Sequence, residues 1–126
     1  MDGIHLLAEW FGCPAQTREF TESSSLRELC LRLVRESGLT IVGDHFHQFE
    51  PQGVTGTVVL SESHLAIHTW PEKGCASVDV YVCNFTTDNT AKAQHLFDSL
   101  RHALRPAHAR EQTIRRSLIE PVRKAA

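Results

Sequence analysis

Apolar and polar side chains alternate, or recur at helical spacing, along most of the chain. Segments 4–10, 39–49, 53–60, 61–69 and 76–83 are predicted to be strands, and 53–60 is the one marked by β-branched residues. The second of them contains Gly43 and Asp44, where we expect a kink. Alternation along the last predicted strand puts two sets of side chains on opposite faces, namely Ala76, Val78, Val80 and Val82 against Ser77, Asp79, Tyr81 and Cys83.

Two other segments have the period of amphipathic helices. In the first, Ser25 and Glu28 form an S-x-x-E capping box, apolar residues follow at helical spacing, and Gly38 ends the helix in a left-handed conformation. The second helix begins near Asp88 and ends before Pro106. Its predicted buried stripe consists of Ala93, Leu96, Phe97, Leu100 and Leu104.

The order of the elements predicts an α+β fold in one domain that spans residues 1–126. Closely spaced strands imply hairpins and a mostly antiparallel sheet, so we expect a two-layer sandwich with both helices on one face. The other face of the sheet would then be bare. A second copy of the chain is the simplest cover for it, so we expect self-association.

The composition narrows the function classes. The chain is 41% hydrophobic and 22% charged with a net charge of -2, as in an ordinary soluble protein. A basic run at 105–116 lacks stacking aromatic residues, which predicts a solvated tail or an edge strand and no nucleic-acid site. No apolar run approaches the roughly 20 residues of a membrane span, and no signal peptide begins the chain, so we expect a cytoplasmic protein. Four cysteines without C-x-x-C spacing are expected to be free thiols.

Reactive side chains are concentrated at residues 60–72, which read LSESHLAIHTWPE. Alternation places Ser63 on one face of the predicted strand and both His64 and His68 on the other. The segment could be a polar rim. It could also hold a metal, but the i, i+4 spacing of the histidines brings ligands together on a helix and not on a strand. A Ser/His hydrolase is a third interpretation, but the G-x-S-x-G elbow is missing.

The string SESHLAIHTWPE, preceded by GVTG and followed by a strand that ends at Cys83, resembles the S-adenosylmethionine decarboxylase proenzymes of bacteria and archaea. GIHLLAEWFGC and HFHQFEPQGVTGTVVLSESHL are similar to the same family, so the resemblance covers residues 3–13 and 39–83. It implies a self-cleaving carboxy-lyase that makes the aminopropyl donor for spermidine synthesis. It also implies a dimer of α/β heterodimers.

Decarboxylation of an α-amino acid needs an electron sink, which ordinary side chains do not provide. The resemblance implies that the Ser63 hydroxyl attacks the carbonyl carbon of Glu62 and breaks the chain there. Residues 1–62 would then form a β chain and residues 63–126 an α chain. Position 63 would become a pyruvoyl group that forms a Schiff base with the substrate, so neither pyridoxal phosphate nor a metal is expected.

The same resemblance implies a role for three further side chains. His68 would be the base for self-processing, for which imidazole is suited near neutral pH. Thr55 would donate to the developing oxyanion, at a position where the family commonly has Ser. Cys83 would donate the proton to the substrate carbanion.

Substrate binding is expected at Phe49, Trp70 and Glu72. Aromatic faces suit an adenine ring and a sulfonium cation, and a carboxylate can accept hydrogen bonds from two ribose hydroxyls. After HTWPE the chain departs from the family at 73–77, and residues 84–126 match it poorly. Ornithine or arginine is therefore an alternative substrate for the same chemistry. A non-catalytic homologue that only binds a partner or ligand is a further alternative.

Overall fold

The computed structural model describes residues 2–117, 119, 120 and 122. Within these residues the strands are β1 (Asp2–Phe11), β2 (Ile41–Gln48), β3 (Val54–Leu60), β4 (Ser63–Trp70), β5 (Cys75–Cys83) and β6 (His108–Ser117). The helices are α1 (Arg18–Thr21), α2 (Ser23–Ser37) and α3 (Thr90–Leu104), with a 3-10 turn, η1, at Pro71–Lys73. The two short helical pieces, α1 and η1, were not predicted.

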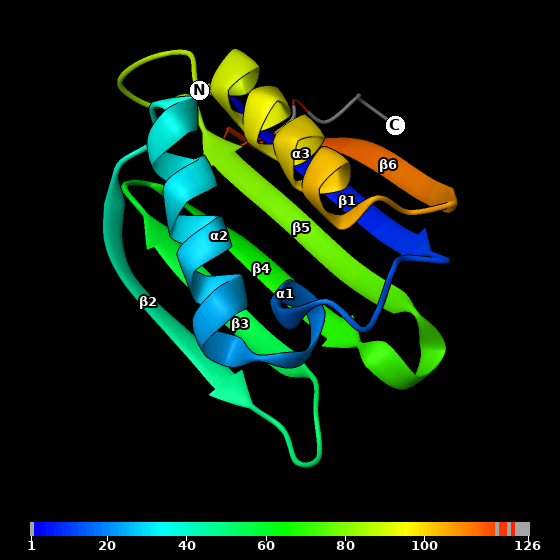
Figure 1. The fold of residues 1–126 in the computed structure, drawn as a ribbon. Coiled ribbons are helices and arrows are strands. Elements are labelled where there is room, and N and C mark those ends of the chain that lie inside the picture. The colour runs from blue at the N-terminus through cyan, green and yellow to red at the C-terminus, as the bar shows by residue number, and fades with distance from the viewer. Residues whose placement is uncertain (1, 118, 121, 123–126) are drawn as a thin grey trace.

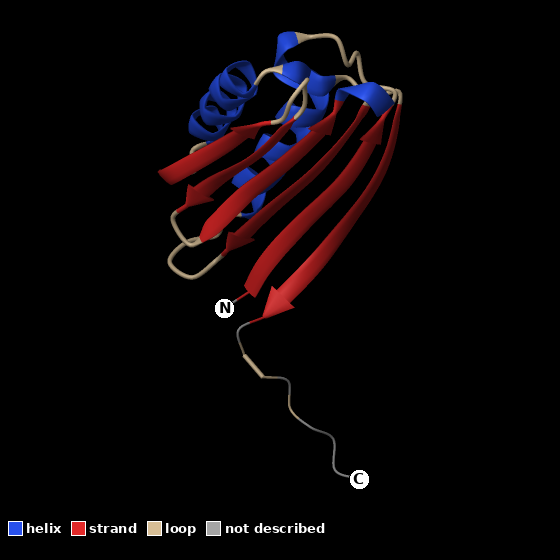
Figure 2. Ribbon diagram, turned by 90° about the horizontal axis from the view of Figure 1, so that it is seen from below, coloured by secondary structure: helices blue, strands red, loops and turns tan. Residues whose placement is uncertain are grey.

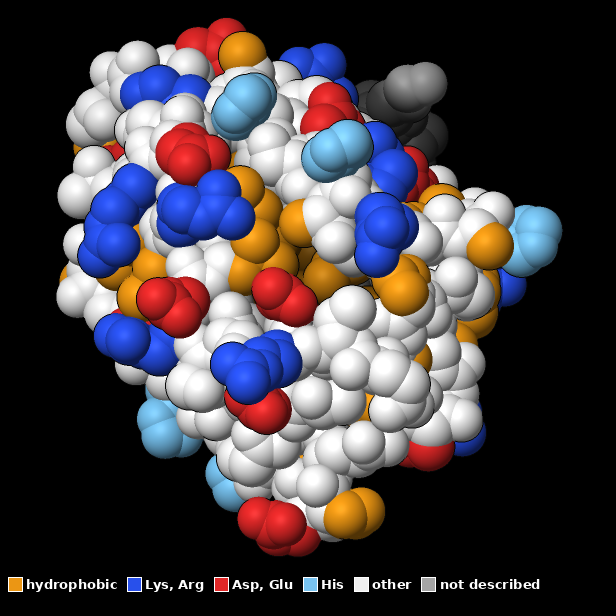
Figure 3. Space-filling view, in the orientation of Figure 1, with side chains coloured by type: hydrophobic (Ala, Val, Ile, Leu, Met, Phe, Trp, Pro, Cys, Tyr) orange, Lys and Arg blue, Asp and Glu red, His pale blue; other side chains and the backbone are white. Residues whose placement is uncertain are grey.

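The strands form a single antiparallel sheet in the order β2-β3-β4-β5-β1-β6. The helices all cover the same face of this sheet, and none of the described helices lies on the opposite face, which we call the bare face (Figures 1 and 2). The predicted two-layer α+β sandwich with the helices on one face is therefore confirmed. On the helix side, acidic and basic side chains are interspersed (Figure 3). None of the helices in the described part is long and apolar enough to cross a membrane.

The core lies between the sheet and the helices because alternation sends one side chain in two toward α2 and α3. Trp10 on β1 and Phe20 on α1 are among the largest fully buried side chains. The predicted stripe of the second helix is buried as expected. The strands contribute chiefly Leu6, Ala8, Val54, Val58, Leu65, Ile67, Val78 and Val80 to this core.

The predicted capping box of the first helix is wrong. Helix α2 begins at Ser23, so Ser25 lies inside it, and no side-chain cap is contributed by Glu22 at the N-cap position. The Ser23 N–H instead donates to Oε1 of Gln48 at 2.6 Å. A residue of a distant strand therefore takes the place of a local cap, which a local motif cannot reveal. The predicted left-handed end at Gly38 is confirmed, with φ 87°.

The basic run near the C-terminus forms an edge strand, one of its two predicted alternatives. Strand β6 pairs with β1 along its whole length although every one of its residues is exposed. Glu111 holds it in place, since its carboxylate accepts from Nε1 of Trp10 at 2.8 Å and from Nε of Arg101 at 2.8 Å. Side chains from β1 and α3 therefore fix the register of this strand.

Candidate active site

The β3–β4 hairpin contains the predicted cleavage position. Leu60 pairs with Ser63, so Ser61 and Glu62 alone form the turn. Glu62 has φ 67°, a conformation that turns usually give to Gly or Asn and that costs an L-residue about 1 kcal/mol. The Ser63 hydroxyl folds back over this turn and donates to the Ser61 carbonyl at 3.2 Å. A strained peptide thus directly precedes the serine predicted to attack it.

Cys83 lies at the same end of the sheet. Continuing the β4–β5 register by one residue sets Ser63 opposite Val82, the neighbour of Cys83. The Cys83 side chain is buried, and its backbone carbonyl accepts from Nδ2 of Asn89 at 3.1 Å. The predicted pyruvoyl position and the predicted proton donor therefore lie at the same end of the sheet, on neighbouring strands. We call Ser63, Cys83 and the Glu62 turn the hairpin half-site.

Thr55 and His68 lie far from that hairpin. They face each other across β3 and β4, and a hydrogen bond of 3.0 Å joins Oγ1 of Thr55 to Nδ1 of His68. The His68 ring stacks on Trp70, with ring centroids 5.8 Å apart. His68 is five residues along β4 from Ser63, which corresponds to roughly 17 Å of strand. One chain therefore does not place the predicted base or oxyanion donor against its own cleavage position.

A pocket beside this pair gathers the predicted substrate-binding residues. Phe49, Trp70 and Glu72 line it together with Thr55, Thr69 and residues 50–53. Phe49 is 47% exposed and Trp70 is 41% exposed, so large aromatic faces are available to a ligand. We call these residues and His68 the pocket half-site. The sequence identified its members, but their separation from Ser63 follows only from the strand register.

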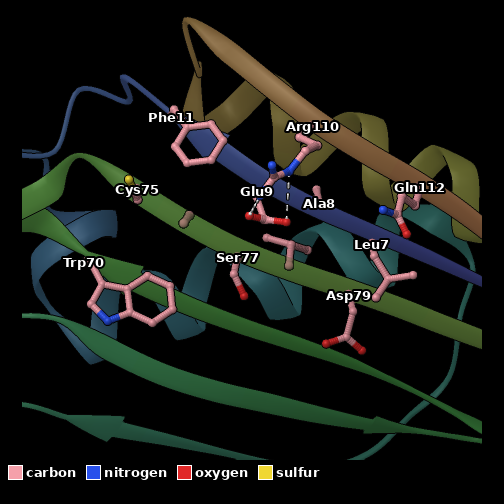
Figure 4. Close-up of a pocket in the computed structure, with 12 residues that line it drawn as sticks. Leu7, Ala8, Glu9, Phe11, Trp70, Cys75, Ser77, Asp79, Arg110 and Gln112 are labelled. Atoms are coloured by element: carbon pink, nitrogen blue, oxygen red, sulfur yellow. Dashed lines mark hydrogen bonds and ion pairs between the residues drawn. The ribbon is translucent and has the colours of Figure 1, made fainter.

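The bare face of the sheet is hollowed next to the pocket half-site. The hollow is floored by β4, β5, β1 and β6, with Phe11 and Trp70 toward one end and Asp79 toward the other (Figure 4). An ion pair between Glu9 and Arg110 crosses it. Exposed apolar side chains, among them Trp70 and Val59, also occupy this face. A monomer would leave this surface in water, which is typical of a face that packs against another chain.

Near the hairpin, the bare face carries a cluster that sequence reasoning missed. His5 and His64 each place Nε2 3.0 Å from the same oxygen, Oδ1 of Asp79. The three ligand atoms lie within 4.8 Å of one another, a spacing that could also hold a metal ion. His64 and His68, the pair considered from the sequence, have different partners. Alternation had placed Asp79 on this face, but only the strand order reveals its contact with His5.

Two of the other cysteines, Cys13 and Cys30, are buried. Burial raises the pKa of the Cys30 thiol to about 12, which suits a packing residue in the core. Burial, with a smaller contribution from nearby Cys75, raises the pKa of Cys13 to about 11. All four cysteines, including Cys83, are free, as predicted.

These features define the class of protein. It is a two-layer α+β domain with a strained, serine-containing hairpin at one end of a bare sheet face and an aromatic pocket at the other. The family model for S-adenosylmethionine decarboxylase matches residues 4–117. The chain therefore belongs to the S-adenosylmethionine decarboxylase family.

Individual relatives agree with this assignment. The chain is 39% identical to the S-adenosylmethionine decarboxylase proenzyme of Aquifex aeolicus over 94% of its own length and 83% of the relative's. It is 41% identical to the proenzyme of Moorella thermoacetica, with 98% and 94% of the two chains covered. The crystal structure of the adenosylmethionine decarboxylase from Aquifex aeolicus matches with a TM-score of 0.84 and 35% identity, over 98% of this chain and 97% of that one.

Proposed function

We propose that this protein is a pyruvoyl-dependent S-adenosylmethionine decarboxylase that cleaves itself between Glu62 and Ser63. The observation that carries the proposal is the hairpin, where Ser63 follows a residue with φ 67° and lies at the same end of the sheet as Cys83, which ends the neighbouring strand. Membership of the decarboxylase family supports the substrate, and the names of the relatives describe proenzymes, as a self-cleaving chain requires.

Cleavage would begin when the Ser63 hydroxyl attacks the carbonyl carbon of Glu62 and the peptide C–N bond breaks, leaving an ester. Loss of the Cα proton of residue 63 then expels Glu62 as a carboxylate and leaves a carbon–carbon double bond at residue 63. Addition of water and loss of ammonia turn that residue into a ketone. Thr55 would donate to the oxyanion of the first step. His68 would take up the Cα proton of residue 63 in the second step.

The ketone would supply the electron sink for loss of CO2. Cys83, at the same end of the sheet as residue 63, would donate a proton to the substrate Cα. Phe49 and Trp70 present aromatic faces for the adenine and the sulfonium, and Glu72 would accept from the ribose hydroxyls.

A complete site would need two copies of the chain. The hairpin and pocket half-sites lie at opposite ends of one sheet, so neither contains all the groups that the chemistry needs. If two bare faces pack with opposite strand directions, the hairpin half-site of each copy meets the pocket half-site of the other. The same packing covers the exposed apolar side chains of this face. We therefore propose a dimer of α/β heterodimers with two shared sites.

Mass spectrometry of the purified protein under denaturing conditions tests the cleavage. We expect two fragments, residues 1–62 and 63–126, the second of them blocked to Edman degradation. Ser63→Ala should remain a single chain of 14.1 kDa. An active wild-type protein that stays in one piece would disprove the proposal.

Release of CO2 tests the substrate. S-adenosylmethionine, ornithine and arginine are supplied in parallel to the cleaved protein, with Ser63→Ala as the blank. We expect turnover of S-adenosylmethionine alone. Turnover of ornithine or arginine in its place would contradict the assigned substrate while leaving the cleavage chemistry intact.

A further inference from the structure

We infer that His64, Asp79 and His5 form a brace that positions residue 63 after the chain has been cut. The inference rests on the proposed function, because it concerns the end that cleavage creates. It assigns these three side chains to positioning and not to contact with the reacting atoms. No part of the self-cleavage step is attributed to them.

The brace ties together three neighbouring strands. His64 on β4 and His5 on β1 both pair with Tyr81 of β5, one from each side. Asp79 lies two residues further along β5 on the same face, so its Oδ1 can accept from both imidazoles, at 3.0 Å each. The contact therefore links β4 to β1 across the whole width of β5.

Cleavage changes what holds residue 63. In the intact chain Ser63 is fixed from both sides, by β4 and by the two-residue turn from Leu60. Once the bond after Glu62 is broken, residue 63 is a strand end and its covalent link to β3 is gone. His64 is then the first side chain of the new chain, and Asp79 is its hydrogen-bond partner on β5. This contact adds a side-chain restraint to the backbone pairing of the new strand end, where chain termini tend to fray.

The brace packs against the ring of Tyr81. The Tyr81 ring lies 5.6 Å from the His5 ring and 5.7 Å from the His64 ring, between centroids. Arg116 lies over the same ring at 4.6 Å. A Cβ on Gly3 would come within 2.8 Å of the Tyr81 ring, so only glycine leaves this ring its place. The imidazoles are thus held by a fixed aromatic side chain as well as by Asp79.

A loosened residue 63 should affect catalysis more than binding. The substrate is bound mainly by the residues of the pocket half-site, to which the brace contributes none, so KM should change little. Misplacement of the reactive carbon by about 1 Å can cost on the order of a hundredfold in rate. We therefore expect kcat to fall roughly ten- to a hundredfold in variants that remove the brace.

A loosened end should also misdirect the proton. If, after CO2 is lost, the proton reaches the carbon of residue 63 and not the substrate Cα, the substrate's amino group stays on the chain. Water then hydrolyses the imine that still joins the two, so that residue 63 becomes alanine and the rest of the substrate leaves as an aldehyde. Alanine at the new end is open to Edman degradation, whereas the ketone is blocked. This readout would not respond to a loss of overall stability.

The experiment compares truncating and conservative variants of the full protein. Asp79→Ala and His64→Ala remove the brace. Asp79→Asn keeps an acceptor oxygen, and His64→Gln keeps an N–H donor. His95→Ala, at an exposed position of α3 across the sheet, is the matched control. For each variant we measure the extent of cleavage, kcat, KM, the melting temperature and the terminal alanine formed per turnover.

We expect every variant to be cleaved, with kcat lowered and terminal alanine raised in the two Ala variants at the brace. The Asn and Gln variants should recover most of kcat, and His95→Ala should match the wild type. The inference is overturned if cleaved Asp79→Ala keeps a normal kcat, or if its loss of activity only follows a lowered melting temperature with no rise in alanine. Failure of the proposed function would look different, since wild type would then show no cleavage at all.

Discussion

Glu62 has a strained backbone, with φ 67°, and it directly precedes the peptide bond that is expected to break. Strain in the intact peptide is relieved when the chain is cut, so it should speed cleavage. Glu62→Gly removes about 1 kcal/mol of strain and should slow cleavage by roughly fivefold. Fragment formation over time on denaturing gels measures this.

Glu62→Ala is the matched control for this prediction. It loses the same carboxylate but keeps a Cβ, and hence the strain, so its rate isolates the effect of the backbone. Equal cleavage rates for the Gly and Ala variants would show that the conformation of residue 62 has no part in the reaction.

Thr55 is the second residue at which the chemistry can be tested singly. Its Oγ1 already bonds to His68 at 3.0 Å, so its hydroxyl has a fixed direction. Loss of one oxyanion donor typically costs about 10²–10³ in rate, and Thr55→Ala should accumulate uncut precursor accordingly. Thr55→Ser keeps the donor and should cleave at least as fast as wild type. A normal rate for Thr55→Ala would remove this residue from the mechanism.

Among the elements, strand β6 is tied to β1 and α3 by the side chain of Glu111. Hydrogen bonding to Arg101 is the main cause that lowers the pKa of Glu111, with a further contribution from Trp10. The charged form is therefore favoured in the folded state. Glu111→Gln should lower the free energy of unfolding by about 1 kcal/mol at neutral pH, measured by urea titration.

The pH dependence follows from the direction of that shift. The contribution of Glu111 is fully present above the pKa of an unfolded glutamate and is lost as the pH falls through the lowered folded value. The stability difference between wild type and Glu111→Gln should therefore shrink toward acid pH. Glu36→Gln is the matched control, because Glu36 forms an exposed ion pair with Arg32 within α2 and should change stability little. A difference that grows on acidification would contradict the assignment.

At the scale of the whole molecule, the separation of the half-sites predicts complementation between two inactive variants. Ser63→Ala lacks the nucleophile and His68→Ala lacks the base, so neither should be cleaved when expressed alone. In a mixed dimer, the Ser63→Ala chain can offer His68 to the intact Ser63 of the other chain. Co-expression should therefore yield cleaved His68→Ala chains, while Ser63→Ala chains stay whole.

Mass spectrometry distinguishes the two chains by the mass of their variants. The double variant Ser63→Ala/His68→Ala, co-expressed with His68→Ala, is the control and should give no cleavage. If His68→Ala cleaves alone, or if no mixture cleaves at all, the two half-sites do not combine between copies in the way proposed.

Much of the fold could be read from local pattern, because alternation and helical spacing record which side of an element is buried. The stripe of α3 and the left-handed Gly38 are examples. The start of α2 could not be read, since its cap is Gln48, a side chain 25 positions away from Ser23. Likewise β6 has no buried residue to mark it, and its pairing is set by β1.

The sequence alone determined the family resemblance and singled out Ser63 and the residues of the pocket half-site as candidates, because these depend on residue types in a short contiguous string. Only the tertiary structure decided where they lie. Strand register separates Ser63 from His68 and brings Asp79 between His5 and His64. Contacts between strands depend on which residues face each other across hydrogen-bonded ladders, and that information belongs to pairs of distant segments and to no single one of them.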